Sequence, residues 1–175
     1  SGNQPLKIGV RIIHFRLNGK LLYISKTEEV LQMSKTAIIY WSGTGNTEAM
    51  AMAVADGAKQ VNPDAALFSV SDITADAAAE YDVLALGCPA MGAEVLEEDE
   101  FEPFFTELEG KLNGKKVALF GSYGWGDGEW MRSWEERINA SGATLVGGEG
   151  LIINEAPDDD ALEQCKKFGS DAANA

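Results

Sequence analysis

The chain has 175 residues, the length of a single globular domain, and 45% of them are hydrophobic. Its 28 acidic residues against 14 basic ones give a formal net charge of -14, which disfavours binding to nucleic acid or anionic membranes and attracts basic protein surfaces. No apolar run reaches the roughly 18 residues of a membrane span. The isolated Cys88 and Cys165 argue against a disulfide scaffold or a zinc site and favour a cytoplasmic protein.

The first 32 residues differ in character from the rest. Residues 11–24 place apolar residues on both sides of Asn18-Gly19, which predicts a β-hairpin. Residues 28–33 can also be encoded by a purine-rich ribosome-binding sequence followed by a start codon, so a second hypothesis is that the natural start is Met33. Both hypotheses separate an N-terminal extension, 1–32, from a domain at 33–175. The only histidine, His14, lies in the extension, so the domain lacks histidine-based catalysis and most kinds of metal site.

From residue 35 onward, strands and helices alternate. We expect strands at 35–40, 65–70, 82–87, 116–121 and 143–153, and helices at 46–59, 74–80, 100–108, 129–139 and 158–173. This alternation predicts an α/β fold with a parallel sheet, and the unbroken apolar runs 83–86 and 117–120 predict strands that are buried on both faces. Ligands of such sheets bind beyond the carboxyl ends of the strands, so the loops that follow the strands are the candidate site.

The first of these loops, 41–47 (WSGTGNT), leads from a strand into a helix. Its glycines, its hydroxyls and the start of the helix can surround a phosphate with N–H and O–H donors. The loop lacks the Lys of a nucleoside-triphosphate loop, and Glu48 stands where a dinucleotide fingerprint needs its third glycine. No Lys or Arg occurs from 36 to 57, so dipoles and hydroxyls alone would hold the phosphate. An ordinary strand-to-helix turn is the alternative.

Two further loops follow the next strands towards the C-terminus. The loop 88–94 (CPAMGAE) is uninformative alone, because Met91 and Cys88 are more often packing residues than ligand contacts. The loop 121–128 (GSYGWGDG) places Trp125 between glycines, where an indole can stack on a planar ring. Filling of the core is the alternative for this tryptophan.

Residues 42–47, 88–94 and 121–130 together resemble the short-chain flavodoxins of anaerobic bacteria, and the similarity extends from about residue 35 to 168. The resemblance implies a doubly wound five-stranded parallel sheet in the order 2-1-3-4-5, with helices on both faces and a non-covalently bound FMN. It implies that the first loop binds the FMN phosphate, that the second borders the isoalloxazine ring and that Trp125 stacks on the ring. The expected cofactor-binding residues are Ser42, Gly43, Thr44, Gly45, Asn46, Thr47, Ala90, Met91, Gly92, Glu94, Ser122, Tyr123, Gly124, Trp125, Gly126 and Asp127; no metal site is expected.

The resemblance further implies that the carbonyl of Gly92 turns toward the flavin when it is reduced. Close relatives often carry an acidic or turn-forming residue where this chain has Ala93. Because alanine tolerates a left-handed conformation poorly, we expect the energetics of this turn to be shifted.

The function implied is that of a low-potential one-electron carrier, not an enzyme, which shuttles between redox enzymes. A run of carboxylates favours a low potential, because it repels the negative charge that the flavin gains; its members are Glu94, Glu97, Glu98, Asp99, Glu100, Glu102, Glu107 and Glu109. We expect a monomer whose partners present basic docking patches in transient complexes, without nucleic acid or membrane.

Three alternatives compete with this interpretation. A flavodoxin-like FMN-dependent NAD(P)H:quinone reductase is disfavoured by the missing dinucleotide fingerprint and by the absence of histidine from the domain. A signalling receiver needs an acidic pair where this chain has Tyr40-Trp41-Ser42. An interaction module without a cofactor would be colourless.

Overall fold

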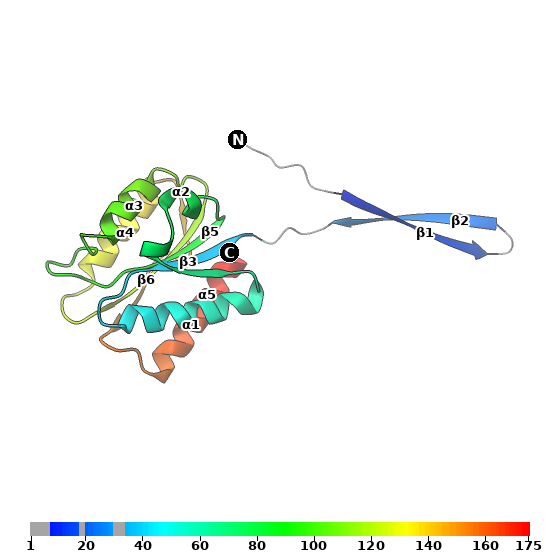
Figure 1. Ribbon diagram of the computed structural model, residues 1–175. Coiled ribbons are helices and arrows are strands. Elements are labelled where there is room, and N and C mark those ends of the chain that lie inside the picture. The colour runs from blue at the N-terminus through cyan, green and yellow to red at the C-terminus, as the bar shows by residue number, and fades with distance from the viewer. Residues whose placement is uncertain (1–7, 18–19, 30–33) are drawn as a thin grey trace. The chain divides into compact units, whose positions relative to one another are not determined.

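The computed structural model describes residues 8–17, 20–29 and 34–175 (Figure 1). The chain divides into two units, Ser1–Met33 and Ser34–Ala175. In the first, β1 (Ile8–Leu17) pairs antiparallel with β2 (Lys20–Glu29), and Leu17 lies opposite Lys20. The Asn18-Gly19 turn itself lies outside the described residues. That residues 1–32 are an extension, or a translated leader, stays a prediction.

The second unit is built on a parallel sheet. Its first four strands are β3 (Thr36–Tyr40), β4 (Ala66–Ser69), β5 (Val83–Gly87) and β6 (Lys116–Tyr123), in the spatial order β4-β3-β5-β6. Two short strands, β7 (Thr144–Leu145) and β8 (Leu151–Asn154), both pair with the far side of β6. Every pairing in this sheet is parallel. Counted as one interrupted strand, β7 and β8 complete the predicted order 2-1-3-4-5, which is thereby confirmed.

The interruption corrects the expectation of one continuous strand at 143–153. Gly147 and Gly148 adopt φ angles of 78° and 79°, a left-handed conformation that, at two successive residues, interrupts a regular β-strand. The chain therefore leaves β6 after Val146, whose N–H still donates to the Val117 carbonyl at 2.8 Å, and pairs with β6 again from Leu151.

The helices cover both faces of the sheet. One face carries α1 (Asn46–Val61) and α5 (Asp159–Asn174); the other carries α2 (Ala75–Ala78), α3 (Phe101–Glu109) and α4 (Glu129–Ala140), and a short 3-10 turn, η1 (Val70–Asp72), follows β4 (Figure 1). Successive strand residues alternate between the two cores, as Ile38 and Ile39 do in β3. Within the described residues, no helix combines the length and apolar character that crossing a bilayer requires.

Helices α1 and α5 meet at backbone contact distance. A Cβ atom at Gly57 of α1 would overlap the carbonyl oxygen of Lys166, and one at Gly169 of α5 would overlap that of Val54. Glycine at both positions therefore sets the separation of the two helices. Both α1 and α5 begin near the carboxyl ends of the strands, where the candidate site is expected. The contact between the two helices at Gly57 and Gly169 therefore also helps to position their N-termini.

We predict that Gly57→Ala lowers the free energy of unfolding by about 1–3 kcal/mol, because the new methyl group must push α5 away. Urea denaturation measures the change. Gly110→Ala is the matched control: Gly110 has a φ of -67° and an added Cβ there would meet no atom within 4 Å. Equal stability of the parent and the Gly57 variant would contradict the close packing of the two helices.

Candidate functional site

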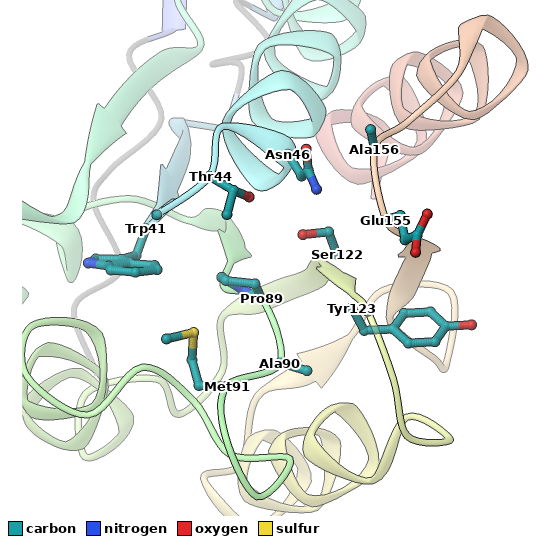
Figure 2. A pocket seen from close by; sticks show the side chains of 12 residues that line it. Trp41, Thr44, Asn46, Pro89, Ala90, Met91, Ser122, Tyr123, Glu155 and Ala156 are labelled. Carbon is teal, nitrogen blue, oxygen red and sulfur yellow. The ribbon is translucent and has the colours of Figure 1, made fainter.

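Three loops meet at the carboxyl edge of the sheet, after β3, β5 and β6. Backbone hydrogen bonds join them side by side: Trp41 N–H donates to the Gly87 carbonyl at 2.9 Å, and Ala90 N–H donates to the Ser122 carbonyl at 3.0 Å. They surround a pocket of about 520 Å³ (Figure 2), a size typical of small-molecule sites. Its lining residues are Trp41, Gly43, Thr44, Asn46, Pro89, Ala90, Met91, Ser122, Tyr123, Gly124, Glu155 and Ala156.

The start of α1 opens into this pocket through Thr44 and Asn46 (Figure 2). Gly45 is the N-cap residue at a φ of 92°, and its carbonyl accepts the first helical hydrogen bond from Ala49 at 2.9 Å. The Ser42 hydroxyl accepts a hydrogen bond from the Gly45 N–H at 3.1 Å, which closes the turn. The N–H groups of the first turn of α1 then remain for another acceptor, since Gly45 has no side chain to cap them.

The other α-helices of the described part each have a side-chain oxygen at their start. Thr74 accepts from Ala77 N–H in α2, and Asp158 accepts from Ala161 N–H in α5. A carboxylate oxygen of Glu94 accepts three N–H bonds where α4 begins, at 3.0–3.1 Å, and the carboxylate of Glu97 accepts three at the start of α3, at 2.8–3.0 Å. The contrast identifies the first turn of α1 as the place where a ligand's anionic group can take the role of a cap.

A buried hydroxyl pair joins the first turn of α1 to the end of β6, where the first and third loops meet these elements. The hydroxyls of Thr47 and Ser122 are 3.0 Å apart, and both residues are at most 5% exposed. The Thr47 oxygen also accepts from the Ser122 N–H at 3.4 Å. Thr47 thus supports the floor of the pocket, while Ser122 lines it.

The second loop is a tight turn closed by two backbone hydrogen bonds between Met91 and Val95, at 2.9 and 3.1 Å. Two residues in it have positive φ angles, Gly92 at 37° and Glu94 at 55°. Ala93 is not among the positive-φ residues. We expected Ala93 to destabilise the turn by adopting a left-handed backbone. In this conformation of the turn that expectation is wrong, because the non-glycine residue with a left-handed backbone is Glu94.

Glu94 reaches away from the second loop to the third. Its carboxylate accepts the N–H groups of residues 127–129, and a Cβ atom at Gly126 would overlap this carboxylate. Trp125, at the tip of the third loop, is 66% exposed and is not a lining residue of the pocket. The side chain of Asp127 pairs with Arg132 at 2.6 Å.

The expected residues thus divide into two groups. Those that line the pocket are Gly43, Thr44, Asn46, Ala90, Met91, Ser122, Tyr123 and Gly124. Those outside the lining are Ser42, Gly45, Thr47, Gly92, Glu94, Trp125, Gly126 and Asp127. Most of the second group shape or connect the loops through the contacts given above. Their contact with a cofactor stays a prediction.

Four lining residues were not predicted: Trp41, Pro89, Glu155 and Ala156. The indole N–H of Trp41 donates to Glu100 at 2.7 Å, and a Cβ at Gly43 would approach the Trp41 ring to 2.9 Å, so glycine lets the ring pack beneath the loop. Glu155 and Ala156 follow β8, and Glu155 has a φ of 56°. The rule that ligands bind at the carboxyl edge could have indicated this fourth loop as well.

The side chains that line the pocket carry no positive charge. Its lining includes the carboxylate of Glu155 and no Lys, Arg or His. In the described part of the chain, no three His, Cys, Asp or Glu side chains are grouped as metal ligands. The pocket therefore offers hydroxyls, amides and a helix N-terminus at one end and the apolar surfaces of Trp41, Met91 and Tyr123 elsewhere, which suits a planar ring attached to a phosphate.

Comparison with known proteins agrees with this chemistry. The sequence profile of the family described as Flavodoxin matches residues 38–169. The chain is 53% identical to the flavodoxin of Clostridium beijerinckii over 137 residues, which are 78% of this chain and 98% of that protein. It is 51% identical to the flavodoxin of Megasphaera elsdenii over 138 residues, 79% and 98% of the two chains.

Solved structures give the same result. The solution structure of the two-electron reduced Megasphaera elsdenii flavodoxin superposes with a TM-score of 0.73 and 52% identity, over 80% of this chain and 99% of that one. A flavodoxin from the domain Archaea superposes with a TM-score of 0.72 and 31% identity, over 80% and 96% of the two chains.

The carboxylate of Glu97 beside the second loop yields a pH-dependent prediction. Burial raises its pKa, but the N–H groups of Asp99, Glu100 and Phe101 outweigh burial and hold the pKa below its usual value. The ionised Glu97 carboxylate therefore stabilises the folded protein. This stabilisation is fully present above the pKa of a glutamate in the unfolded chain, about 4.3, and is lost as the pH falls through the lower pKa that Glu97 has in the folded protein. We predict that Glu97→Gln lowers the free energy of unfolding at pH 7 by about 1–3 kcal/mol.

Urea denaturation of both proteins from pH 7 down to pH 3 checks this prediction, and the difference between them should shrink below about pH 4. The exposed Glu98, substituted as Glu98→Gln, is the control and should behave like the parent. A Glu97 variant as stable as the parent at neutral pH would show that the cap contributes nothing.

Proposed function

Because the chain belongs to the flavodoxin family, we infer that it is an electron carrier that binds one FMN non-covalently and passes single electrons between redox enzymes. When bound, FMN supplies the redox chemistry by accepting and releasing electrons at its isoalloxazine ring. The observation that carries the inference is the uncapped first turn of α1, which opens into a pocket of suitable size.

We propose that this turn binds the FMN phosphate. Thr44 and Asn46 line the pocket there and add a hydroxyl and an amide to the backbone N–H groups. Ser42 and Thr47 support the loop through their hydrogen bonds to Gly45 and Ser122. Since no cation lines the pocket, the phosphate is held by hydrogen bonds and by the helix dipole.

The ring is assigned to the apolar part of the pocket. Met91 lines the pocket and would border the ring from the second loop, and the carbonyl of Gly92 would be available as an acceptor for a proton at the edge of the ring. Trp125 has 66% of its surface exposed, which leaves its indole available to stack on the ring from the third loop. Trp41, held by Glu100, is a further wall that the sequence did not indicate.

The surrounding charge supports a low reduction potential. Glu155 lines the pocket, Glu100 holds one of its walls, and Glu98 and Asp99 are exposed beside the second loop. Each carboxylate raises the energy of a ring that gains negative charge, and no lining cation offsets them. The same acids suit transient, salt-sensitive complexes with basic patches on redox enzymes.

A flavodoxin-like NAD(P)H:quinone reductase is not favoured, since the relatives that match along 98% of their length are named flavodoxins. Two points about the carrier are proposals only: that it is monomeric and that it works in the cytoplasm. Cys88 and Cys165, both buried and unpaired with one another, support the second point.

The phosphate site is tested by comparing FMN with riboflavin, which lacks the phosphate. We predict that Thr44→Val weakens FMN binding about 10-fold or more, the effect of losing one hydrogen bond to a charged group, and leaves riboflavin binding unchanged. Quenching of flavin fluorescence gives both dissociation constants. Tyr123→Phe, which removes a hydroxyl from the other side of the pocket, is the matched control. Equal weakening for both ligands would place the phosphate elsewhere.

The electrostatic proposal is tested at Glu155. We predict that Glu155→Gln raises the midpoint potential of the second one-electron reduction by roughly 20–70 mV, because one repulsive charge is removed. Spectroelectrochemical titration of the FMN-loaded protein measures it. Asp64→Asn is the control. It removes an equal charge from the turn before β4, at the amino ends of the strands and so on the side of the sheet opposite the pocket, and it should shift the potential far less. An equal shift in both variants would indicate an effect of net charge alone.

A further inference from the structure

A groove lies between α1 and α5, the two helices that cover one face of the sheet (Figure 1). It has a volume of about 400 Å³ and shares no lining residue with the pocket assigned to FMN. Each helix contributes the positions i, i+3, i+4 and i+7, so one stripe of each helix forms one side of the α1–α5 groove. The lining residues are Ala49, Met52, Ala53, Asp56, Asp159, Leu162, Glu163 and Lys166.

The glycine contact between the two helices lies at one end of this groove. Gly57 directly follows the lining residue Asp56, and the carbonyl that a Cβ at Gly57 would overlap belongs to the lining residue Lys166. From this contact the two stripes extend towards the N-termini of α1 and α5 over two turns, about 10 Å. A groove between two helices can receive the side chains of a third helix.

The middle of the groove is apolar and accessible. Met52 is 57% exposed, and in residues 34–175 the other exposed large hydrophobic side chains are Val95 and Trp125. Those two belong to the loops beside the FMN pocket, whereas Met52 lines the groove together with the partly buried Leu162. Methionine is flexible and adapts to different partners, which makes it common at binding surfaces.

Carboxylates surround this apolar surface. Asp56 is the lining residue of α1 farthest from its N-terminus, and Asp159 lies in the first turn of α5, so the two lie towards opposite ends of the groove. Neither aspartate has an ion-pair partner in the described part of the chain. The lining cation, Lys166, is already engaged by Glu163 at 2.6 Å. The groove therefore presents negative charge around an apolar centre.

This charge decides which occupant fits. A second copy of this chain would bring the same carboxylates against one another, and like charges oppose association. Nucleic acid and anionic membranes would be repelled as well. The occupant must combine an apolar side chain with positive charge, and the length of the two stripes matches about two turns of a docked helix.

We propose that the α1–α5 groove is a docking site for a basic amphipathic helix of a partner protein. An apolar side chain of the partner packs on Met52 and Leu162, and its lysines or arginines pair with Asp56 and Asp159. Because the groove shares no lining residue with the FMN pocket, a partner held here leaves that pocket free. The assignment does not depend on the identity of the redox cofactor.

The test uses a synthetic helical peptide of about four turns, with leucines along one face and lysines beside them, and the FMN-loaded protein. A peptide of the same composition with its leucines scattered around the helix is the comparison. Fluorescence anisotropy of the labelled peptides gives the dissociation constants. We expect the amphipathic peptide to bind saturably, about 5-fold or more tightly than the scattered one, and less tightly at high salt.

The position of the bound peptide is read from the NMR signals of ¹³C-methyl-labelled methionines. Met52→Gln identifies the Met52 signal by its loss, and this signal should shift in the parent when the amphipathic peptide binds. We expect Met52→Gln to weaken binding about 3–10-fold, because apolar contact is lost. Asp56→Asn should weaken it about 2–5-fold and reduce its dependence on salt. Glu107→Gln is the matched control: it removes the same charge from an exposed position of α3, on the other face of the sheet, and should change binding by less than about 2-fold.

Three results would overturn the proposal. Equal binding of the two peptides, or equal weakening by Asp56→Asn and Glu107→Gln, would show a general attraction to an acidic surface. A Met52 signal that stays in place while the peptide binds would locate the peptide elsewhere. Hexylamine that shifts the Met52 signal with the same affinity as the peptide would assign the groove to small organic cations. None of these readouts involves electron transfer, so failure here leaves the FMN assignment unaffected.

Discussion

The N-terminus of α1 is the constraint on which the site depends. A helix leaves its first N–H groups unsatisfied, and in every other α-helix of the described part of the chain a side-chain oxygen accepts one of these N–H groups. In α1 the N-cap is Gly45, which contributes only backbone. Glycine also allows the φ of 92° that turns the strand into the helix. In the proposed complex, the ligand's phosphate accepts the N–H groups that no side chain accepts.

The neighbouring loops are positioned relative to this turn by few but specific contacts. The Thr47–Ser122 hydroxyl pair joins the first loop to the third, and Glu94 joins the second to the third by accepting three N–H groups. The close approach of α1 to α5 at Gly57 holds the helix that presents the turn. These contacts connect the three segments, and in the proposed complex they would link the phosphate site to the surroundings of the ring.

Much of this arrangement could be predicted from the sequence because it follows from local rules. Alternating strands and helices imply a parallel sheet, and a parallel sheet brings the loops after β3, β5 and β6 to one edge. The break between β7 and β8 was missed, although Gly147-Gly148 signals it. Glu155, the Trp41–Glu100 contact and the path of Glu94 to α4 depend on distances between segments far apart in the chain, which no local pattern encodes.

The absence of Lys, Arg and His from the pocket lining makes the proposed phosphate binding compatible with a low potential in one small domain. A lysine or arginine would bind the phosphate more strongly, but its charge would also stabilise a ring that has gained electrons and so raise the potential. Backbone dipoles are strong at contact and fall off within a turn of the helix. In the proposed complex the phosphate is bound by short-range forces, while the longer-range field at the ring is left to carboxylates such as Glu155. The two tasks are separated by the different distances over which dipoles and charges act.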